Sequence, residues 1–160
     1  MQIVIVGARL GRDDDADKVL VDQIIDDCKD RYAKLLIVTK SGDKGVGKFI
    51  LDRCRSARDN GDHDFDMIEI SLRHILKREI PKNEFLGHFY TLNAALVELG
   101  DEFHLLAEEF PAGAMQDILK RIKERSLLYA LYKPSELNGG PKRPTLDGGT
   151  SISTISSNGG

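Results

Sequence analysis

The stretch KLLIVTKSGDKGVGKFILDRCRSA, residues 34–57, contains the three features that decide the fold. It opens with an apolar run rich in β-branched residues, which predicts a buried strand over 34–40. A glycine-rich turn follows, and then apolar residues recur at the spacing of an amphipathic helix, with Val46, Phe49, Ile50 and Ala57 on one face. A strand, a turn and a helix in this order predict one unit of an α/β fold.

The same alternation continues on both sides of this stretch. Further apolar runs predict strands over 2–6, 65–71, 102–108 and 127–132, and helical spacing predicts helices between them, including one from about 83 to 99. Parallel neighbours need long crossover connections, and the crossover helices cover both faces of the sheet. The sequence therefore predicts an α/β fold of the Rossmann-like type. We expect a three-layer sandwich with a mainly parallel five-stranded sheet and helices on both faces.

The composition indicates one globular domain with a tail. The 160 residues are 41% hydrophobic and 31% charged, which is typical of a folded domain, and we place it at residues 1–133. Residues 134–160 are rich in Gly, Ser, Thr and Pro, so we predict a flexible tail there. The net charge of -3 argues against a nucleic-acid partner. With no basic leader and no long apolar run at the start, we expect a cytoplasmic protein without a membrane partner.

The cysteines and histidines show no metal-binding pattern in the sequence. Cys28 and Cys54 are far apart and match neither a disulfide framework nor a metal knuckle, so we expect two buried free thiols. His104 lies inside a predicted strand, where a hydrogen-bonded core histidine is expected. The other three histidines have no ligand spacing with each other or with the cysteines. The sequence predicts no metal and no cofactor.

The turns after the first, second and fourth predicted strands all carry glycine. In an open α/β sheet, ligands bind beyond the carboxyl ends of the strands, near the point where the strand order reverses. Glycine allows the backbone to approach a ligand closely, and the N–H groups at the start of the next helix attract an anion, typically a phosphate. We therefore predict a ligand-binding crevice lined by Gly7, Ala8, Arg9, Ser41, Gly42, Gly45, Gly47, Lys48, Ala112, Gly113, Ala114 and Met115.

Two of these turns raise alternatives. Gly42, Gly47 and Lys48 fit the G-x-x-x-x-G-K pattern of a nucleoside triphosphate loop, but Phe49 stands where the loop needs a Ser or Thr hydroxyl for Mg²⁺. Phe49 fits the core face of the helix instead, so we predict a glycine turn. Arg9 is predicted either to pair with a phosphate or to be an ordinary surface residue.

Three segments together resemble a known family. They are MQIVIVGAR (1–9), IVTKSGDKGVGKFILDRC (37–54) and FYTLNAALVELGDEFHLLAEEFPAGAMQDIL (89–119). Their order resembles the SLOG superfamily, the Rossmann-like group that includes the DprA-type proteins and the Lonely Guy phosphoribohydrolases, over residues 1–133. The resemblance implies that the crevice binds a nucleotide or a nucleotide-derived signal molecule, such as a cyclic or ADP-ribose-type compound. Such folds often pair through crossover helices, so we expect a homo-oligomer.

The hydrolase members of that group carry P-G-G-x-G-T-x-x-E after the fourth strand, where this chain reads PAGAMQD (111–117). The resemblance matches Ala114 to the motif threonine and Asp117 to the catalytic glutamate, and it matches Leu92 and Asn93 to an Arg-Lys pair. The missing hydroxyl and arginine argue against hydrolysis. The catalytic residues are therefore unknown, with Asp117 and Glu108 as candidates. Asn93 is expected either to face the crevice and bind the ligand or to cap nearby backbone groups.

Three functions follow from these patterns. The first is binding, by which the protein senses or sequesters a nucleotide-type small molecule in the crevice. The alternative is an enzyme, a nucleotide phosphoribohydrolase or related N-glycosidase. A further alternative is a structural subunit of a larger assembly whose crevice is vestigial.

Overall fold

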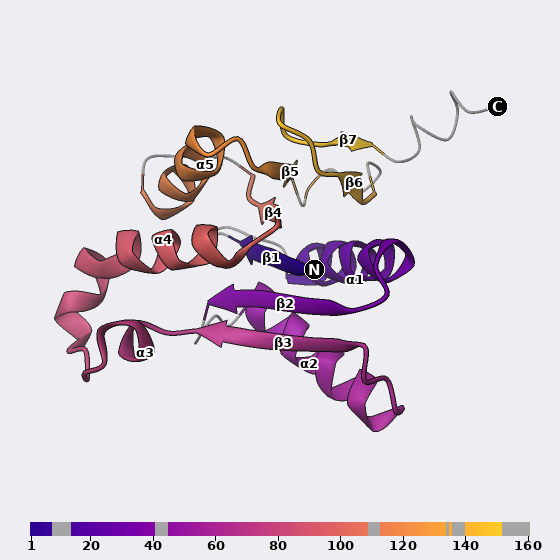
Figure 1. The fold of residues 1–160 in the computed structure, drawn as a ribbon, viewed down its shortest axis with the longest axis horizontal. Helices are drawn as coiled ribbons and strands as arrows, with labels where there is room; N and C mark the ends of the chain where they lie inside the picture. Colours follow the sequence, from indigo (N-terminus) through magenta and orange to yellow (C-terminus); the bar gives the residue numbers. More distant parts are fainter. Residues whose placement is uncertain (8–13, 41–44, 109–112, 134, 136–139, 152–160) are drawn as a thin grey trace.

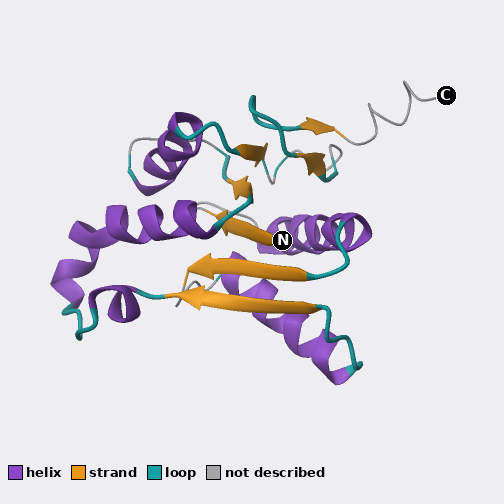
Figure 2. Ribbon diagram, in the orientation of Figure 1, coloured by secondary structure: helices purple, strands orange, loops and turns teal. Residues whose placement is uncertain are grey.

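The computed structural model describes residues 1–7, 14–40, 45–108, 113–133, 135 and 140–151. Figure 2 shows the strands and helices alternating along the chain. In chain order they are β1 (Gln2–Gly7), α1 (Asp14–Arg31), β2 (Leu35–Lys40), α2 (Val46–Asp59), β3 (Phe65–Ile70), α3 (Leu72–Leu76), the 3-10 helix η1 (Lys82–His88), α4 (Phe89–Leu99), β4 (Glu102–Leu106), α5 (Ala114–Glu124), β5 (Leu128–Tyr132), β6 (Lys142–Arg143) and β7 (Thr150–Ser151).

The first five strands form one parallel sheet in the order β3-β2-β1-β4-β5, which confirms the predicted fold class. The chain starts in the middle of the sheet, moves outward through β2 to β3, and then crosses to the other side of β1 for β4 and β5 (Figure 1). The strand order therefore reverses between β1 and β4. This reversal is where ligands bind in open α/β sheets.

Side chains of alternating direction along the central strands build one core on each face of the sheet. Ile3 and Ile5 pack with the buried residues of α1 and α2, whereas Val4 and Val6 pack with those of α4 and α5. The buried strands lack polar alternation because helices cover both faces. The three-layer arrangement is visible in Figure 1.

The segment before β4 is more broken than the periodicity predicts. The expected helix from 83 to 99 is split into η1 and α4, and a five-residue helix, α3, precedes it. The Ser71 hydroxyl caps α3 by accepting a hydrogen bond from the His74 amide at 3.3 Å. Such a short helix does not complete two turns, so its apolar residues show no period.

Part of the expected flexible tail, residues 140–151, has regular secondary structure, which the composition does not predict. These residues form the β6–β7 hairpin, and the backbone of β5 pairs with it through Tyr129 N to Thr145 O at 2.9 Å and Leu131 N to Gly148 O at 2.9 Å. Backbone pairing needs no apolar side chains, so the polar composition of this segment hides it. Gly148 and Gly149 have φ of 109° and 96°, the left-handed region that favours glycine. Residues 134, 136–139 and 152–160 of the expected tail lie outside the described residues.

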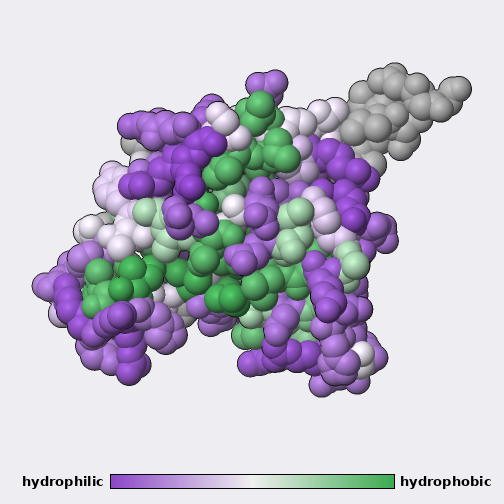
Figure 3. Space-filling model, in the orientation of Figure 1, coloured by the Kyte–Doolittle hydropathy of each residue, from purple (hydrophilic) through white to green (hydrophobic). Residues whose placement is uncertain are grey.

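The helices cover the outer part of the sheet incompletely. Ile68 on β3 is 41% exposed and Tyr90 on α4 is 49% exposed. Figure 3 shows hydrophobic residues gathered over the middle of this face of the molecule, between hydrophilic margins.

The homo-oligomer stays a prediction. In the part of the chain that the structure describes, no helix is both long enough and apolar enough to cross a membrane.

Candidate functional site

The turns that are expected to line the crevice follow strands that end at one edge of the sheet. Strands β2, β1 and β4 are adjacent and parallel, so their carboxyl ends and the turns that follow them are neighbours. Gly7 is the last residue of β1 and pairs with Leu106 of β4 across the switch point. Of the other predicted lining residues, Ala8, Arg9, Ser41, Gly42 and Ala112 lie outside the described residues.

The N-terminus of α2 follows β2 at this edge and is one predicted wall of the crevice. Gly45 is the N-cap residue, Gly47 is buried in the first turn, and Lys48 is exposed. The first turn carries no acidic residue, so the positive end of the helix dipole faces no carboxylate of its own helix. Phe49 packs partly buried against the core under α1 and α2, which confirms the predicted core position and leaves no hydroxyl for Mg²⁺ there.

Thr39 lies near the carboxyl end of β2, the strand that leads into α2. Its side chain is fully buried, and its Oγ1 atom has no hydrogen-bond partner among the described residues. Thr39 lies two residues after Ile37 on β2, so the two side chains point to the same face of the sheet. Ile37 belongs to the core under α1 and α2, so the Thr39 hydroxyl is on that side of the sheet. A buried hydroxyl without a partner costs stability and therefore calls for an explanation.

The N-terminus of α5 follows β4 at the same edge and is the other predicted wall of the crevice. Gly113 precedes the helix with φ of 126°, and a Cβ at this position would meet no atom within 4 Å. Glycine is therefore required there by the backbone and not by crowding. Met115 is only 7% exposed and its side chain is in the core, so only its backbone N–H could serve a ligand.

Asn93 of α4 lies against this first turn of α5. Its Nδ2 atom donates to the backbone oxygen of Ala114 at 2.8 Å and to Oδ2 of Asp117 at 3.0 Å. Both partners are acceptors, which fixes the orientation of the amide, and the Oδ1 atom is left buried without a partner among the described residues. Asn93 thus caps a backbone group, one of its two expected roles. Its contact with a ligand stays a prediction.

Both candidate catalytic acids are engaged in other contacts. The Asp117 carboxylate accepts from Asn93 and from Nε of Arg121 at 2.9 Å. Glu108 accepts from the backbone N–H and the hydroxyl of Ser135, each at 2.6 Å. A general acid needs to donate a proton to the substrate, whereas these carboxylates are held as acceptors.

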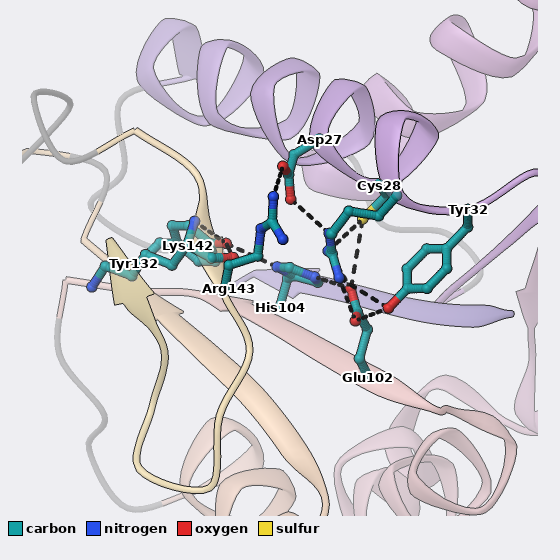
Figure 4. A network of polar contacts seen from close by, with 9 residues as sticks. Asp27, Cys28, Tyr32, Glu102, His104, Tyr132, Lys142 and Arg143 are labelled. Carbon is teal, nitrogen blue, oxygen red and sulfur yellow. Dashed lines mark hydrogen bonds and ion pairs between the residues drawn. The ribbon is translucent and has the colours of Figure 1, made fainter. Parts of the chain in front are cut away.

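A second polar cluster lies buried between α1 and β4, and Figure 4 shows it. Its centre is Glu102, which is 3% exposed. Arg31 binds both oxygens of this carboxylate, at 3.0 Å and 2.7 Å, and Tyr32 donates to it at 2.9 Å. Nε2 of His104 lies 3.0 Å from the same carboxylate, and Sγ of Cys28 lies 3.6 Å away. Four residues from two distant segments therefore converge on one carboxylate.

The cluster extends to the C-terminal hairpin. Nδ1 of His104 lies 2.9 Å from the Tyr132 hydroxyl, which contacts both the backbone N–H and the oxygen of Lys142. Asp27 binds Nε of Arg31 at 2.9 Å and lies 3.5 Å from Arg143. The hairpin is therefore joined to α1 and β4 through hydrogen bonds and an ion pair.

Burial and hydrogen bonding act in opposite directions on the pKa values of this cluster. Burial alone would raise the pKa of Glu102, but the hydrogen bonds from His104 and Arg31 outweigh it and hold the pKa well below its usual range. Burial lowers the pKa of His104, so this histidine is neutral. Burial and the neighbouring carboxylate raise the pKa of Cys28 to about 12, which keeps the thiol protonated.

The sequence analysis placed Cys28, Cys54 and His104 in the core, and all three are buried. It did not find that Cys28 and His104 share a partner, because 74 residues separate Cys28 from Glu102. The one available signal was Glu102 two residues before His104, since alternate residues of a strand point to the same face. A glutamate and a histidine on one buried face require partners.

The three comparisons with known proteins gave no assignment. No protein-family model, no curated protein and no solved structure matches this chain.

Proposed function

We propose that this protein binds a nucleotide or a nucleotide-derived signal molecule in the crevice at the carboxyl ends of β1, β2 and β4, and that it senses or sequesters this ligand. One observation carries the proposal. Two polar atoms near this edge, Oγ1 of Thr39 and Oδ1 of Asn93, are buried without a partner among the described residues. One belongs to the strand that leads into α2, and the other lies beside the first turn of α5.

The chemistry of the two walls suggests the ligand class. The N-termini of α2 and α5 offer backbone N–H groups and positive dipole ends, which favour phosphate oxygens. Oδ1 of Asn93 is an acceptor and needs a donor, such as a sugar hydroxyl or an amino group of a base. A nucleotide carries phosphates and both kinds of donor. The resemblance to the SLOG superfamily supports the same class.

The hydrolase alternative has less support. Its two candidate acids, Asp117 and Glu108, are both bound to other groups. Incubating the protein with AMP and with ADP-ribose and analysing the products distinguishes the two functions. Recovery of intact ligand supports binding, whereas release of a base that stops in an Asp117→Asn variant supports hydrolysis.

The first test is mass spectrometry of small molecules released when the purified protein is denatured, followed by thermal unfolding with AMP, ADP, cyclic AMP and ADP-ribose. A ligand at a hundred times its Kd stabilises the folded state by about 2.7 kcal/mol, which is easily measured. If no molecule is released and no nucleotide raises the Tm, the proposal is wrong and the structural-subunit alternative gains support.

The second test uses Thr39→Val. This change removes a buried hydroxyl without a partner, so it should raise the Tm of the ligand-free protein and weaken ligand binding at least tenfold. Gln23→Met is the matched control, because Oε1 of Gln23 is also buried with no partner in the described part of the chain but lies on α1. The control should bind the ligand like the unchanged protein. Equal binding by Thr39→Val and the control would contradict the role of Thr39.

A further inference from the structure

The buried cluster between α1 and β4 contains three metal-ligand side chains. Sγ of Cys28, a carboxylate oxygen of Glu102 and a ring nitrogen of His104 lie within 4.8 Å of one another, and all three residues are buried. A thiolate, a carboxylate and an imidazole form a donor set that zinc accepts. The cluster lies on the α1 side of the sheet and is separate from the residues of the proposed nucleotide crevice.

The distances are close to those of a zinc site. Around tetrahedral zinc, with bonds of about 2.3 Å to sulfur and about 2.0 Å to nitrogen or oxygen, neighbouring ligand atoms lie about 3.3–3.6 Å apart. The Sγ atom of Cys28 is 3.6 Å from Oε1 of Glu102, and Nε2 of His104 is 3.0 Å from the same oxygen. The remaining pair, Sγ and Nε2, lies within 4.8 Å and needs to approach by up to about 1.3 Å, which rotation of the cysteine side chain can supply.

His104 has a partner that suits a metal ligand. A histidine that binds a metal through one nitrogen usually donates the proton on its other nitrogen to a fixed acceptor. Here Nδ1 lies 2.9 Å from the Tyr132 hydroxyl, and that hydroxyl lies 3.2 Å from the Lys142 oxygen. In the Nδ1–H tautomer, His104 donates to Tyr132 and Tyr132 donates to Lys142, which leaves Nε2 as a free acceptor facing Glu102 and Cys28.

A cation already lies beside these atoms. Nη2 of Arg31 is 2.7 Å from Oε1 of Glu102 and 3.4 Å from Sγ of Cys28. A metal ion in this position displaces the guanidinium from Glu102, and Arg31 retains Asp27, which it binds through Nε at 2.9 Å. Arg143, the other cation near Asp27, is 44% exposed and 3.5 Å away, so it can turn to solvent.

The charges then balance. A divalent ion, the Cys28 thiolate and the Glu102 carboxylate sum to zero, and so do Arg31 and Asp27. The thiol proton leaves to solvent, and the His104 proton moves from Nε2 to Nδ1. Buried charges are tolerated when they are neutralised in this way.

We propose that Cys28, Glu102 and His104 form a buried binding site for a thiophilic divalent cation, Zn²⁺, that ties α1 to β4. Soft thiolate and imidazole ligands select zinc over magnesium or calcium. Because a cysteine binds zinc as the thiolate, binding releases the thiol proton and strengthens as the pH rises.

The test is a titration of metal-free protein with Co²⁺, which replaces Zn²⁺ in such sites and reports a thiolate ligand by sulfur-to-metal charge-transfer absorption in the near ultraviolet. The expected result is a charge-transfer band that saturates at one Co²⁺ per chain and disappears when Zn²⁺ is added. The band should vanish in Cys28→Ser. It should persist in Cys54→Ser, the matched control, because Cys54 is the other buried free thiol but is not part of the cluster.

A second variant separates ligation from folding. His104→Gln removes the imidazole and leaves the thiol, so it should weaken Co²⁺ binding at least tenfold while retaining the charge-transfer band at high Co²⁺ concentration. Circular dichroism establishes that each variant is folded before titration. The proposal is overturned if the unchanged protein gives no charge-transfer band, or if the band survives Cys28→Ser and is lost in Cys54→Ser.

Discussion

Replacing Glu102 by Gln should destabilise the protein severely. The side chain is 3% exposed, and its carboxylate accepts from Arg31, Tyr32 and His104. Glutamine has one acceptor oxygen and adds an NH₂ group that faces these donors, so at least one donor loses its partner. Breaking a buried ion pair on one side costs about 3–5 kcal/mol. For a chain of this size each kcal/mol lowers the Tm by about 2–4 °C, so the expected fall is about 6–20 °C.

The assay is urea denaturation followed by circular dichroism, with Asp66→Asn as the matched control. Asp66 pairs with Arg58 on the surface, where the two side chains are 52% and 58% exposed, and removing such a pair costs about 1 kcal/mol or less. If Glu102→Gln lowers the free energy of unfolding no more than the control does, the network does not hold α1 to β4 and the reasoning is refuted.

Three further predictions concern pH, the thiols and one glycine. Burial lowers the pKa of His104, so as the pH falls the unfolded chain takes up a proton before the folded chain does. At pH values below about 6.5 the free energy of unfolding should therefore decrease as the pH falls, by up to about 1.4 kcal/mol per pH unit. In urea denaturation at a series of pH values, His104→Gln should make this decrease smaller. Burial raises the pKa of Cys28 to about 12 and that of Cys54 to about 11. Neither thiol should therefore react with a disulfide reagent at pH 8 until urea unfolds the protein. Reaction in the native state would show that the thiols are accessible. In Gly100→Ala the new Cβ would lie 2.6 Å from two core side chains, so the free energy of unfolding measured by urea denaturation should fall by about 1–3 kcal/mol. Gly87→Ala is the control, because its Cβ would meet no atom within 4 Å and should not destabilise the protein by crowding. Equal falls in the free energy of unfolding for the two variants would contradict this difference.

The sequence predicts the sheet well because buried parallel strands carry a strong local signal. Each predicted strand overlaps an observed one, and their bounds differ by at most two residues, as in β4, which ends at Leu106 and not at 108. The crossover rules limit the possible strand orders but do not select one, and no motif in the sequence specifies the observed order. Local patterns of this kind do not show which side chains meet, so the adjacency of the turns after β1, β2 and β4 could be predicted but the side-chain contacts near them could not.

Two features escaped prediction for physical reasons. The β6–β7 hairpin is held by backbone hydrogen bonds to β5, and these leave little trace in the composition of residues 140–151. The cluster around Glu102 joins side chains that are far apart in the chain, and no spacing rule connects Glu102 and His104 of β4 with Cys28 and Arg31 of α1. The contact of Asn93 with Asp117 was hidden in the same way, because Asn93 reaches this carboxylate only when α4 and α5 pack together. Arg121, in contrast, follows Asp117 by four residues on α5, a spacing that can be read from the sequence.

Mapping the ligand by NMR tests the proposed crevice most directly. Adding ADP-ribose or AMP to ¹⁵N-labelled protein should shift the amide signals of Gly45 to Lys48 and of Gly113 to Met115 together, at one common Kd. These are the described residues at the starts of α2 and α5. If the shifts instead cluster on another surface, or if no signal moves with any nucleotide at millimolar concentration, the crevice is not a nucleotide site.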